Sequence, residues 1–274
     1  MSSAATPPAT VAVRVHASVA RVTLERPHVH NAFDDAMIAE LTRVLQGLGD
    51  DHQVRVVVLQ GAGHSFCAGA DLDWMRRTAA YDEVQNQDDA RRLAALLATL
   101  DALPKPVVAR VHGNVLGGGV GLCACCDIAV AADDARFALS EARVGLIPAT
   151  IGPYVVDAIG PRAARRYMLT AERFDAREAL RLGLVHELVA ADALDARVDA
   201  LVATLLEAGP QAQAEAKRLI RRVRHGAIDA GMIADTARHI AAVRASPEGR
   251  EGIAAFLERR MPAWRRTDGG PGQA

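Results

Sequence analysis

The amino-acid sequence predicts an α/β fold with one large core, and three observations support this prediction. Apolar, β-branched runs typical of buried strands alternate with segments whose apolar residues recur every three to four positions, as on one face of a helix. A chain of 274 residues buries roughly three quarters of the surface that its unfolded form exposes. Its 24% charged and 50% apolar residues are ordinary for a globular protein and argue against disorder.

The beginning of the chain is predicted to contain a hairpin, a turn, a helix and a strand. Residues 11–15 and 20–25 alternate or run apolar, and we expect them to pair across Ala17–Ser18. A proline-containing turn follows at 26–31, and the β-branched run 54–60 indicates a buried strand. The helix before that strand has its apolar stripe at Met37, Ile38, Leu41, Val44, Leu45 and Leu48.

The middle of the chain continues this alternation. A long helix is expected over 88–103, and two prolines then end it and lead into a buried strand over 107–112. The glycines 117–119 open a short helix to about residue 126, and 127–132 returns as a strand. The inward face of the long helix is predicted at Leu93, Leu96, Leu97 and Leu100.

The second half of the chain, from Pro161 onward, has an almost entirely helical pattern. Asp175 followed by Glu178 is typical of a capping-box start. Ser246 followed by Pro247 indicates an N-cap with proline in the first helical position. We find no internal repeat.

These patterns divide the chain into four parts. We expect the α/β core, with the functional site, in residues 11–205, and a helical segment without an obvious core of its own in 206–264. Residues 1–10 are predicted to be a disordered leader, and the polar, glycine-rich residues 265–274 a flexible tail.

The charge balance argues against several classes of function. The chain has 32 Lys and Arg against 33 Asp and Glu, a net charge of −1, whereas nucleic-acid and membrane-surface binders need a clustered basic face. No apolar run reaches the ~20 residues that span a bilayer, and the first residues lack the features of a signal peptide. We therefore expect a soluble cytoplasmic protein without nucleic-acid or membrane partners. Only Lys105 and Lys217 are lysines, so a ligand that needs a cation would mostly meet arginine.

The four cysteines do not indicate a metal site. Cys67 stands alone, and the cluster Cys123, Cys125 and Cys126 has no second pair of ligands at the usual zinc spacing. Because the cluster lies in an apolar stretch, we expect buried packing.

Two glycine-rich loops, 61–71 and 112–121, each follow a predicted buried strand. A dinucleotide site is one interpretation of the first loop, but Phe66 stands where its fingerprint needs glycine. A phosphate loop would need lysine and a hydroxyl residue after the last glycine, where the second loop has Val120 and Leu122. We favour an oxyanion hole built from one main-chain N–H of each loop, the second at the start of a helix.

These loops belong to a set of four motifs that resembles the crotonase, or enoyl-CoA hydratase/isomerase, superfamily from about Val11 to Trp264. The other two are the turn Arg26-Pro27-x-x-x-Asn31-Ala32 and the segment Phe137-x-x-x-Glu141-x-x-x-Gly145-x-Ile147-Pro148. The resemblance implies a spiral of ββα units, helices at the C-terminus that build an oligomer, and homotrimers or hexamers. It also implies an acyl-CoA substrate, with no separate cofactor because CoA is part of that substrate.

The family's site residues map onto particular positions of this chain. The thioester oxygen would sit between the N–H groups of Ala70 and Gly118. Asp71 has two interpretations, a CoA contact or the cap of the next helix. The resemblance assigns substrate or CoA contacts to Val29, Ala32, Ala68, Gly69, Asp71, Leu72, Gly117, Gly121 and Arg143.

Glu141 is the expected proton-transfer group, with a buried structural acid as the other interpretation. Hydratases of the family use two glutamates, and Gly121 stands at the second position here. Glu141 would then act alone, or with help from water, the substrate or another residue.

Within this superfamily the sequence resembles bacterial methylglutaconyl-CoA and isohexenylglutaconyl-CoA hydratases, which also carry glycine at the position of Gly121. Their substrates are 3-branched and bear a second carboxylate, for which we consider Arg143 or a nearby arginine. An extended backbone would place Arg143 and Glu141 on opposite faces, and a surface salt bridge is its other interpretation. Alternative functions are a Δ3,Δ2-enoyl-CoA isomerase, an acyl-CoA decarboxylase, or an RNA-binding protein of the same fold.

Overall fold

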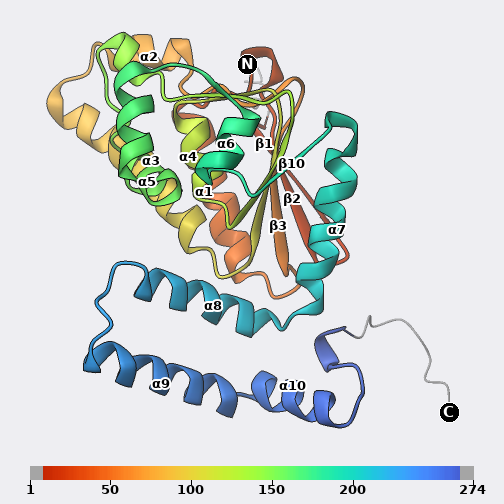
Figure 1. Ribbon diagram of the computed structural model, residues 1–274. Coiled ribbons are helices and arrows are strands. Elements are labelled where there is room, and N and C mark those ends of the chain that lie inside the picture. The colour runs from red at the N-terminus through yellow and green to blue at the C-terminus, as the bar shows by residue number, and fades with distance from the viewer. Residues whose placement is uncertain (1–8, 266–274) are drawn as a thin grey trace, which may run out of the picture.

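The computed structural model describes residues 9–265 and confirms the α/β prediction with two sheets and surrounding helices (Figure 1). The six-stranded sheet consists, in spatial order, of β1 (Val11–His16), β2 (Val19–Leu24), β3 (Val56–Gly61), β5 (Val107–Val111), β7 (Ile128–Ala132) and β10 (Glu187–Val189). The four-stranded sheet consists of β4 (Ser65–Cys67), β6 (Asn114–Leu116), β8 (Arg136–Ala138) and β9 (Phe174–Asp175). The predicted hairpin is β1 and β2, which pair antiparallel.

The strands alternate between the two sheets along the chain, which gives the expected ββα spiral. In each unit the first strand joins the large sheet and the second joins the small sheet: β3 then β4, β5 then β6, β7 then β8. Neighbours from successive units are parallel in both sheets. The helices after these units are α2 (Leu72–Thr78) and α3 (Glu83–Ala102), α4 (Gly118–Ala124), and α5 (Gly152–Thr170).

Both faces of the large sheet are buried at β3, whose side chains alternate between two cores. Val57 and Leu59 belong to the main core, which also holds the apolar stripes of α1 (Asp35–Asp50) and α3. Val56 and Val58 pack under α7 (Leu194–Glu207) on the other face. The shorter elements are α6 (Ala176–Leu182) and the 3-10 turns η1 (Pro27–Val29), η2 (Glu141–Val144), η3 (Ala191–Ala193) and η4 (Ala263–Arg265).

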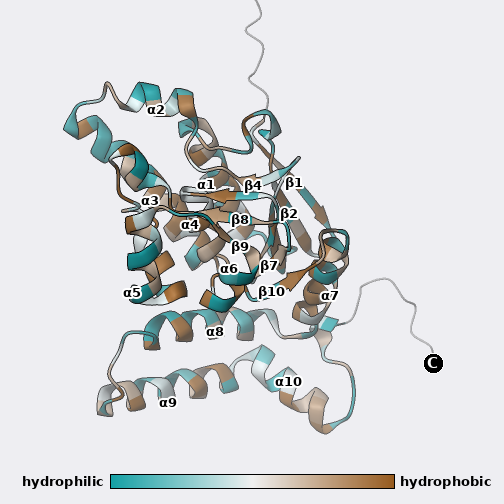
Figure 2. Ribbon diagram, turned by 45° about the horizontal axis from the view of Figure 1, so that its top comes forward, coloured by the Kyte–Doolittle hydropathy of each residue, from teal (hydrophilic) through white to brown (hydrophobic). Residues whose placement is uncertain are grey.

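The C-terminal helices form a layer outside this core (Figure 1). They are α8 (Pro210–Val223), α9 (Ala230–Ala245) and α10 (Pro247–Leu257), and Ala255 is their one buried residue. Apolar and polar residues alternate along all three helices (Figure 2). Phe256 is 82% exposed and Leu257 73% exposed. The predicted boundary at residue 205 falls inside α7, which ends at Glu207.

Several predicted boundaries were wrong. The helix α3 begins at Glu83 instead of residue 88, because Asp82 and Gln85 form a capping box. The strands of the small sheet were missed, since two or three residues are too short to show an alternation. Thr10, predicted to belong to the leader, is held by the core, because its N–H and hydroxyl both donate to Glu40. Residues 1–8 and 266–274 lie outside the described part of the chain.

All four cysteines are buried, as predicted, and burial raises the pKa of Cys67 and of Cys123 to about 12. No helix within residues 9–265 is long and apolar enough to cross a membrane.

Candidate active site

The two glycine-rich loops meet at one edge of the small sheet. The strands β4 and β6 are parallel neighbours, with Cys67 opposite Val115, so their carboxyl ends lie side by side. A Cβ on Gly69, whose φ is +86°, would lie 2.8 Å from the Leu116 carbonyl oxygen and 3.6 Å from the Gly118 nitrogen. The approach of the loops therefore requires glycine at position 69.

The N–H groups of Ala70 and Gly118 are unused at this edge. The Phe33 N–H donates to the Gly69 oxygen at 2.8 Å, and the Asp71 N–H donates to the Phe33 oxygen at 3.0 Å. Because Ala70 lies between these two bonds, its own N–H points away from Phe33. Neither the Ala70 N–H nor the Gly118 N–H donates a hydrogen bond to any described residue.

Phe33 supports both amides, and sequence reasoning missed it. Its backbone forms hydrogen bonds with Gly69 and Asp71, the residues before and after Ala70. Its ring lies directly beside Gly118, because a Cβ built on Gly118 would lie only 2.1 Å from the ring carbon Cζ. The residue is 2% exposed and also packs near Trp74, with 6.2 Å between the ring centroids. The sequence offered one signal for it, because Phe33 directly follows the motif Asn31-Ala32.

The third parallel strand, β8, brings Glu141 to the same edge. The Gly117 N–H donates to the Ala138 oxygen at 2.8 Å, which ties the second loop to the end of β8. A Cβ on Gly117 would lie 3.1 Å from Glu141 Oε1, so the carboxylate sits directly against this loop. Glu141 Oε2 is buried and has no hydrogen-bond partner among residues 9–265. Burial raises the pKa of Glu141 above its ordinary value, and a hydrogen bond from its own backbone opposes this only in part.

Ile151 occupies the space beside Gly121, where the resemblance places a second glutamate. Gly121 is buried in α4, and a Cβ there would lie 2.2 Å from Ile151 Cγ2. Ile151 is 2% exposed and immediately precedes α5. A side chain at position 121 therefore cannot be built without moving Ile151, which sequence analysis had not singled out.

A cleft of about 470 Å³ gathers five of the predicted contact residues and Ala70. It is lined by Val29, Ala32, Ala68, Ala70, Asp71 and Leu72, together with His28, His30, Asp73 and Arg76. A groove of about 730 Å³ between α8 and α9 is larger, but none of the predicted site residues lines it.

Comparison with known proteins identifies the family of this chain. The sequence matches the family described as enoyl-CoA hydratase/isomerase over residues 14–267. The chain belongs to the enoyl-CoA hydratase/isomerase family. It is an enzyme of the hydro-lyase class, and the match supports enoyl-CoA hydration in general.

Relatives within this family cover nearly the whole chain. A solved enoyl-CoA hydratase from Shewanella pealeana is 45% identical, with a TM-score of 0.91, over 93% of this chain and 96% of that one. Enoyl-CoA hydratase AKT6-1 of Alternaria alternata is 36% identical over 246 residues, 88% of this chain and 78% of the relative. The 2,3-dehydroadipyl-CoA hydratase of Escherichia coli K12 is 33% identical over 243 residues, 88% of this chain and 92% of the relative.

Asp71 of this family member caps a helix and also borders the cleft. Its Oδ1 accepts hydrogen bonds from the Asp73 N–H at 2.8 Å and the Trp74 N–H at 3.1 Å, at the start of α2. Its Oδ2 lies 3.1 Å from Arg26 Nη2. Burial alone would raise the pKa of Asp71, but the two amides and the Arg26 guanidinium together lower it below its ordinary value.

Arg143 follows Glu141 by two residues on the same 3-10 turn. The backbone is not extended here, because residues 141–144 form the 3-10 turn η2, so the alternation of faces along an extended strand does not apply. With about three residues per turn, side chains two positions apart point in different directions. Arg143 is exposed and forms no ion pair with another residue of the described range 9–265.

Proposed function

We propose that the chain adds water across the α,β double bond of an enoyl-CoA thioester, whose oxygen is held by the N–H groups of Ala70 and Gly118. The observation that carries this proposal is the pair of adjacent loops that present two unused N–H groups beside the free oxygen of Glu141. Two amides aimed at a developing enolate oxygen stabilise the transition state by several kcal/mol.

One carboxylate suffices for this reaction. As the water oxygen bonds to Cβ, Glu141 takes a proton from the water, and the electron pair of the double bond moves toward the thioester oxygen as an enolate. When the carbonyl re-forms, Cα takes the proton back from Glu141. The carboxylate is thereby regenerated, and the product has gained one molecule of water.

The cleft beside these groups is the proposed site of the CoA moiety. Its walls come from η1 and from the loop between β4 and α2, the two segments that the resemblance assigns to CoA contacts. His28, His30 and Arg76 provide the polar nitrogens of this cleft. The proposal includes homotrimers or hexamers, which would cover the exposed apolar residues of α10.

A panel of enoyl-CoA esters, followed by the loss of the enoyl thioester absorbance, tests the proposed hydration. Turnover of at least one ester is expected, with one solvent oxygen incorporated into the product. Absence of turnover across short, long and branched esters would contradict the proposal.

Isomerisation is the second candidate, and the packing of Ile151 against Gly121 favours it. A single carboxylate can move a proton between two carbons of a Δ3-enoyl thioester without any water. Incubation in ¹⁸O water separates the two reactions, because only hydration places ¹⁸O in the product.

We propose a 3-branched, glutaconyl-type enoyl-CoA as the substrate, with its distal carboxylate bound by Arg143. The Escherichia coli relative is named for 2,3-dehydroadipyl-CoA, a thioester of a dicarboxylic acid. Arg143 is exposed and forms no ion pair within residues 9–265, so its guanidinium is available for a carboxylate.

Replacement of Arg143 tests this choice of substrate. We expect Arg143→Met to lower kcat/KM for 3-methylglutaconyl-CoA about tenfold or more, and to leave crotonyl-CoA within about twofold, because a charged hydrogen bond contributes about 1.5–3 kcal/mol. Arg162→Met, at an exposed position of α5, is the matched control. Equal losses with both esters would contradict recognition of the carboxylate.

A further inference from the structure

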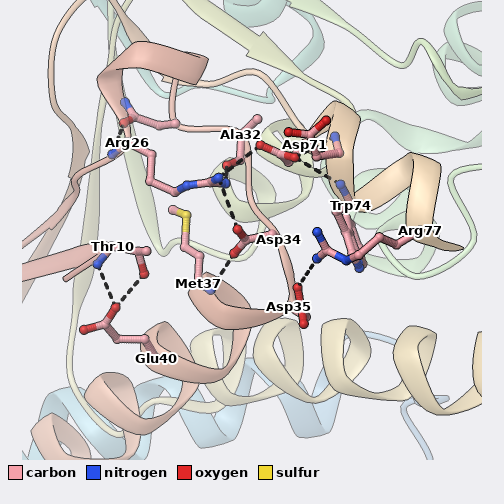
Figure 3. Close-up of polar contacts among 12 residues, drawn as sticks. Thr10, Arg26, Ala32, Asp34, Asp35, Met37, Glu40, Asp71, Trp74 and Arg77 are labelled. Carbon is pink, nitrogen blue, oxygen red and sulfur yellow. Dashed lines mark hydrogen bonds and ion pairs between the residues drawn. The ribbon is translucent and has the colours of Figure 1, made fainter. Parts of the chain in front are cut away.

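Arg26 joins two loops that are far apart in the sequence (Figure 3). Its side chain is 14% exposed. One end of the guanidinium, Nη1, donates to the Ala32 carbonyl oxygen at 2.5 Å. The other end, Nη2, lies 3.1 Å from Asp71 Oδ2 and 3.1 Å from Asp34 Oδ2.

These contacts lie on either side of the backbone bridge between Phe33 and Ala70. Ala32 directly precedes Phe33, whose N–H binds the Gly69 oxygen, and Asp71 directly follows Ala70. Arg26 therefore holds the residue before Phe33 and the residue after Ala70 at the same time. Because the Phe33 ring also packs against Gly118, this arrangement fixes the distance between the two unused N–H groups.

We propose that Arg26 is a positioning residue of the oxyanion site, which keeps the Ala70 N–H aimed at the thioester oxygen. This inference rests on the proposed function. Arg26 does not itself reach the reacting atoms in this role. It acts through the Ala32 carbonyl and the Asp71 carboxylate, which define the course of the first loop.

The backbone of Arg26 is fixed as firmly as its side chain. The Arg26 N–H donates to Asn31 Oδ1 at 2.9 Å, and Asn31 is completely buried. The amide of Asn31 donates to the carbonyl oxygens of Ala62 at 2.8 Å and Ser65 at 2.7 Å, at the beginning of the first loop. The turn at 26–31 thus holds both ends of the loop that carries Ala70.

Only a guanidinium fits this arrangement of acceptors. Arg26 offers donors on two separate nitrogens in a rigid plane, one toward a carbonyl and the other between two carboxylates. A lysine ammonium is a single point of charge and cannot span them. The two carboxylates in turn cap α1 and α2, so Arg26 connects the loop to the starts of two helices.

The test compares Arg26→Met and Arg26→Lys with the wild-type chain in kcat, KM and carbonyl polarisation. We expect kcat of the Met variant to fall at least about tenfold and up to about 10²-fold, the loss that a displacement of 1 Å causes. The Lys variant should lose less. KM should change by less than kcat, because the lost interaction develops in the transition state.

Polarisation is measured as the shift of the thioester C=O stretching band when butyryl-CoA labelled with ¹³C at that carbonyl binds. Butyryl-CoA has no double bond to hydrate, so this readout does not depend on turnover. We expect the shift to be smaller in both Arg26 variants, whereas a residue needed only for folding would lower the amount of folded protein and leave the band of the bound ester unchanged.

Arg77→Met is the matched control, because Arg77 joins the same α2 to Asp35 of α1 through an exposed ion pair (Figure 3). Its kcat and band shift should match those of the wild type. If Arg26→Met does not fold, Asp71→Asn replaces it, since asparagine still caps α2 but removes the charge that Arg26 holds.

The inference and the proposed function fail in different ways. Wild-type kcat and an unchanged band in folded Arg26→Met would overturn the inference and leave hydration standing. The opposite result is a band shift that is present in the wild type and reduced in the Arg26 variants, with no hydration of any ester. It would overturn the proposed reaction and leave the role of Arg26 standing.

Discussion

The carboxylate of Glu141 is partly buried, and its Oε2 oxygen has no hydrogen-bond partner in the described chain, 9–265. Burial raises the pKa of Glu141, which means that this carboxylate binds a proton more tightly in the folded protein than in the unfolded chain. Such a group favours folding below its unfolded-state pKa, and this contribution is lost as pH rises through the folded-state pKa. At neutral pH the charged Glu141 is therefore unfavourable for stability, although the proposed reaction needs it in that form.

Glu141→Gln should accordingly lower activity and raise stability. We expect turnover to fall by about 10²–10⁴, as for loss of a general acid–base group, while a saturated acyl-CoA still binds. Stability at neutral pH should rise by about 1 kcal/mol, because the buried charge is removed. This gain should shrink as pH is lowered through the raised pKa of Glu141. Urea unfolding over a pH series, together with turnover, measures both effects.

Glu172→Gln is the matched control for the sign of the stability change. A hydrogen bond from Arg166 lowers the pKa of Glu172, so its charged form favours folding at neutral pH. Its replacement should leave turnover unchanged and should not raise stability. Unchanged turnover in Glu141→Gln would remove Glu141 from the proposed reaction.

The helices α4 and α5 approach each other at Gly121 and Ile151. Gly121 lies in the interior of α4, where a Cβ would lie 2.2 Å from Ile151 Cγ2 and 3.6 Å from Leu97 Cδ2. Ile151 is buried against the glycine backbone, in the space that a side chain at position 121 would need. The same packing explains why the proposed site operates with one carboxylate, since a second would displace a well-packed core residue.

Gly121→Ala should therefore destabilise the chain by about 1–3 kcal/mol, the usual range for an overpacked core. Ile151→Ala leaves a cavity and should destabilise by about 2–5 kcal/mol. In the double variant the new methyl group fills part of that cavity, so the combined loss should be smaller than the sum. Chemical denaturation of the four proteins measures this coupling.

Gly47→Ala in α1 is the matched control. No atom lies within 4 Å of a Cβ built there, so alanine should stabilise the helix by about 0.5–1 kcal/mol. Strict additivity of the Gly121 and Ile151 changes would contradict direct contact between the two positions.

At the scale of the whole molecule, both lysines of the chain take part in the contact between the outer helices and the core. The Lys217 ammonium, on α8, binds Asp127 Oδ2 at 2.6 Å and the Lys105 carbonyl oxygen at 2.9 Å. Its side chain is 11% exposed. Lys105 in turn donates to the Asp51 carbonyl oxygen. Burial raises the pKa of Asp127, and the nearby Lys217 opposes that shift. Because α8 has no buried residue, polar contacts such as this one attach it to the core, and Arg224, which binds Asp157, provides another.

Lys217→Met should loosen that attachment. Asp127 would lose the Lys217 ammonium and keep the hydrogen bond from the Val107 N–H, and loss of a hydrogen bond between charged groups costs about 1.5–3 kcal/mol. We expect faster amide hydrogen exchange in α8 and α9, and unchanged exchange in β3 and β5, which lie in the core. Arg218→Met removes an exposed ion pair with Glu215 on the same helix. It should change amide exchange neither in the outer helices nor in the core strands. If amide exchange in α8 and α9 of Lys217→Met matched that of the wild type, α8 would be held by other contacts.

Much of the fold follows from patterns within short stretches of sequence. The run of apolar residues in 54–60 specifies a strand buried on both faces, and it became β3. The stripe from Met37 to Leu48 specifies the inward face of α1. The small sheet could not be predicted in this way. Its strands have two or three residues, and each pairs with a strand that is distant in the sequence, as Ser65 does with Asn114 and Asn114 with Arg136.

The sequence alone determined the alternation of strands and helices, the two glycine-rich loops and the position of Glu141, because each depends on residues close together in the chain. Only the tertiary structure decided that these loops meet, that Phe33 supports both N–H groups, and that Ile151 fills the place of a second carboxylate. Arg26 could not be given a role from its local pattern, because its acceptors lie at Ala32 and Asp71 and come together only when the spiral brings the two loops to one edge. Contacts between distant segments depend on the packing of the whole core, and no local pattern contains them.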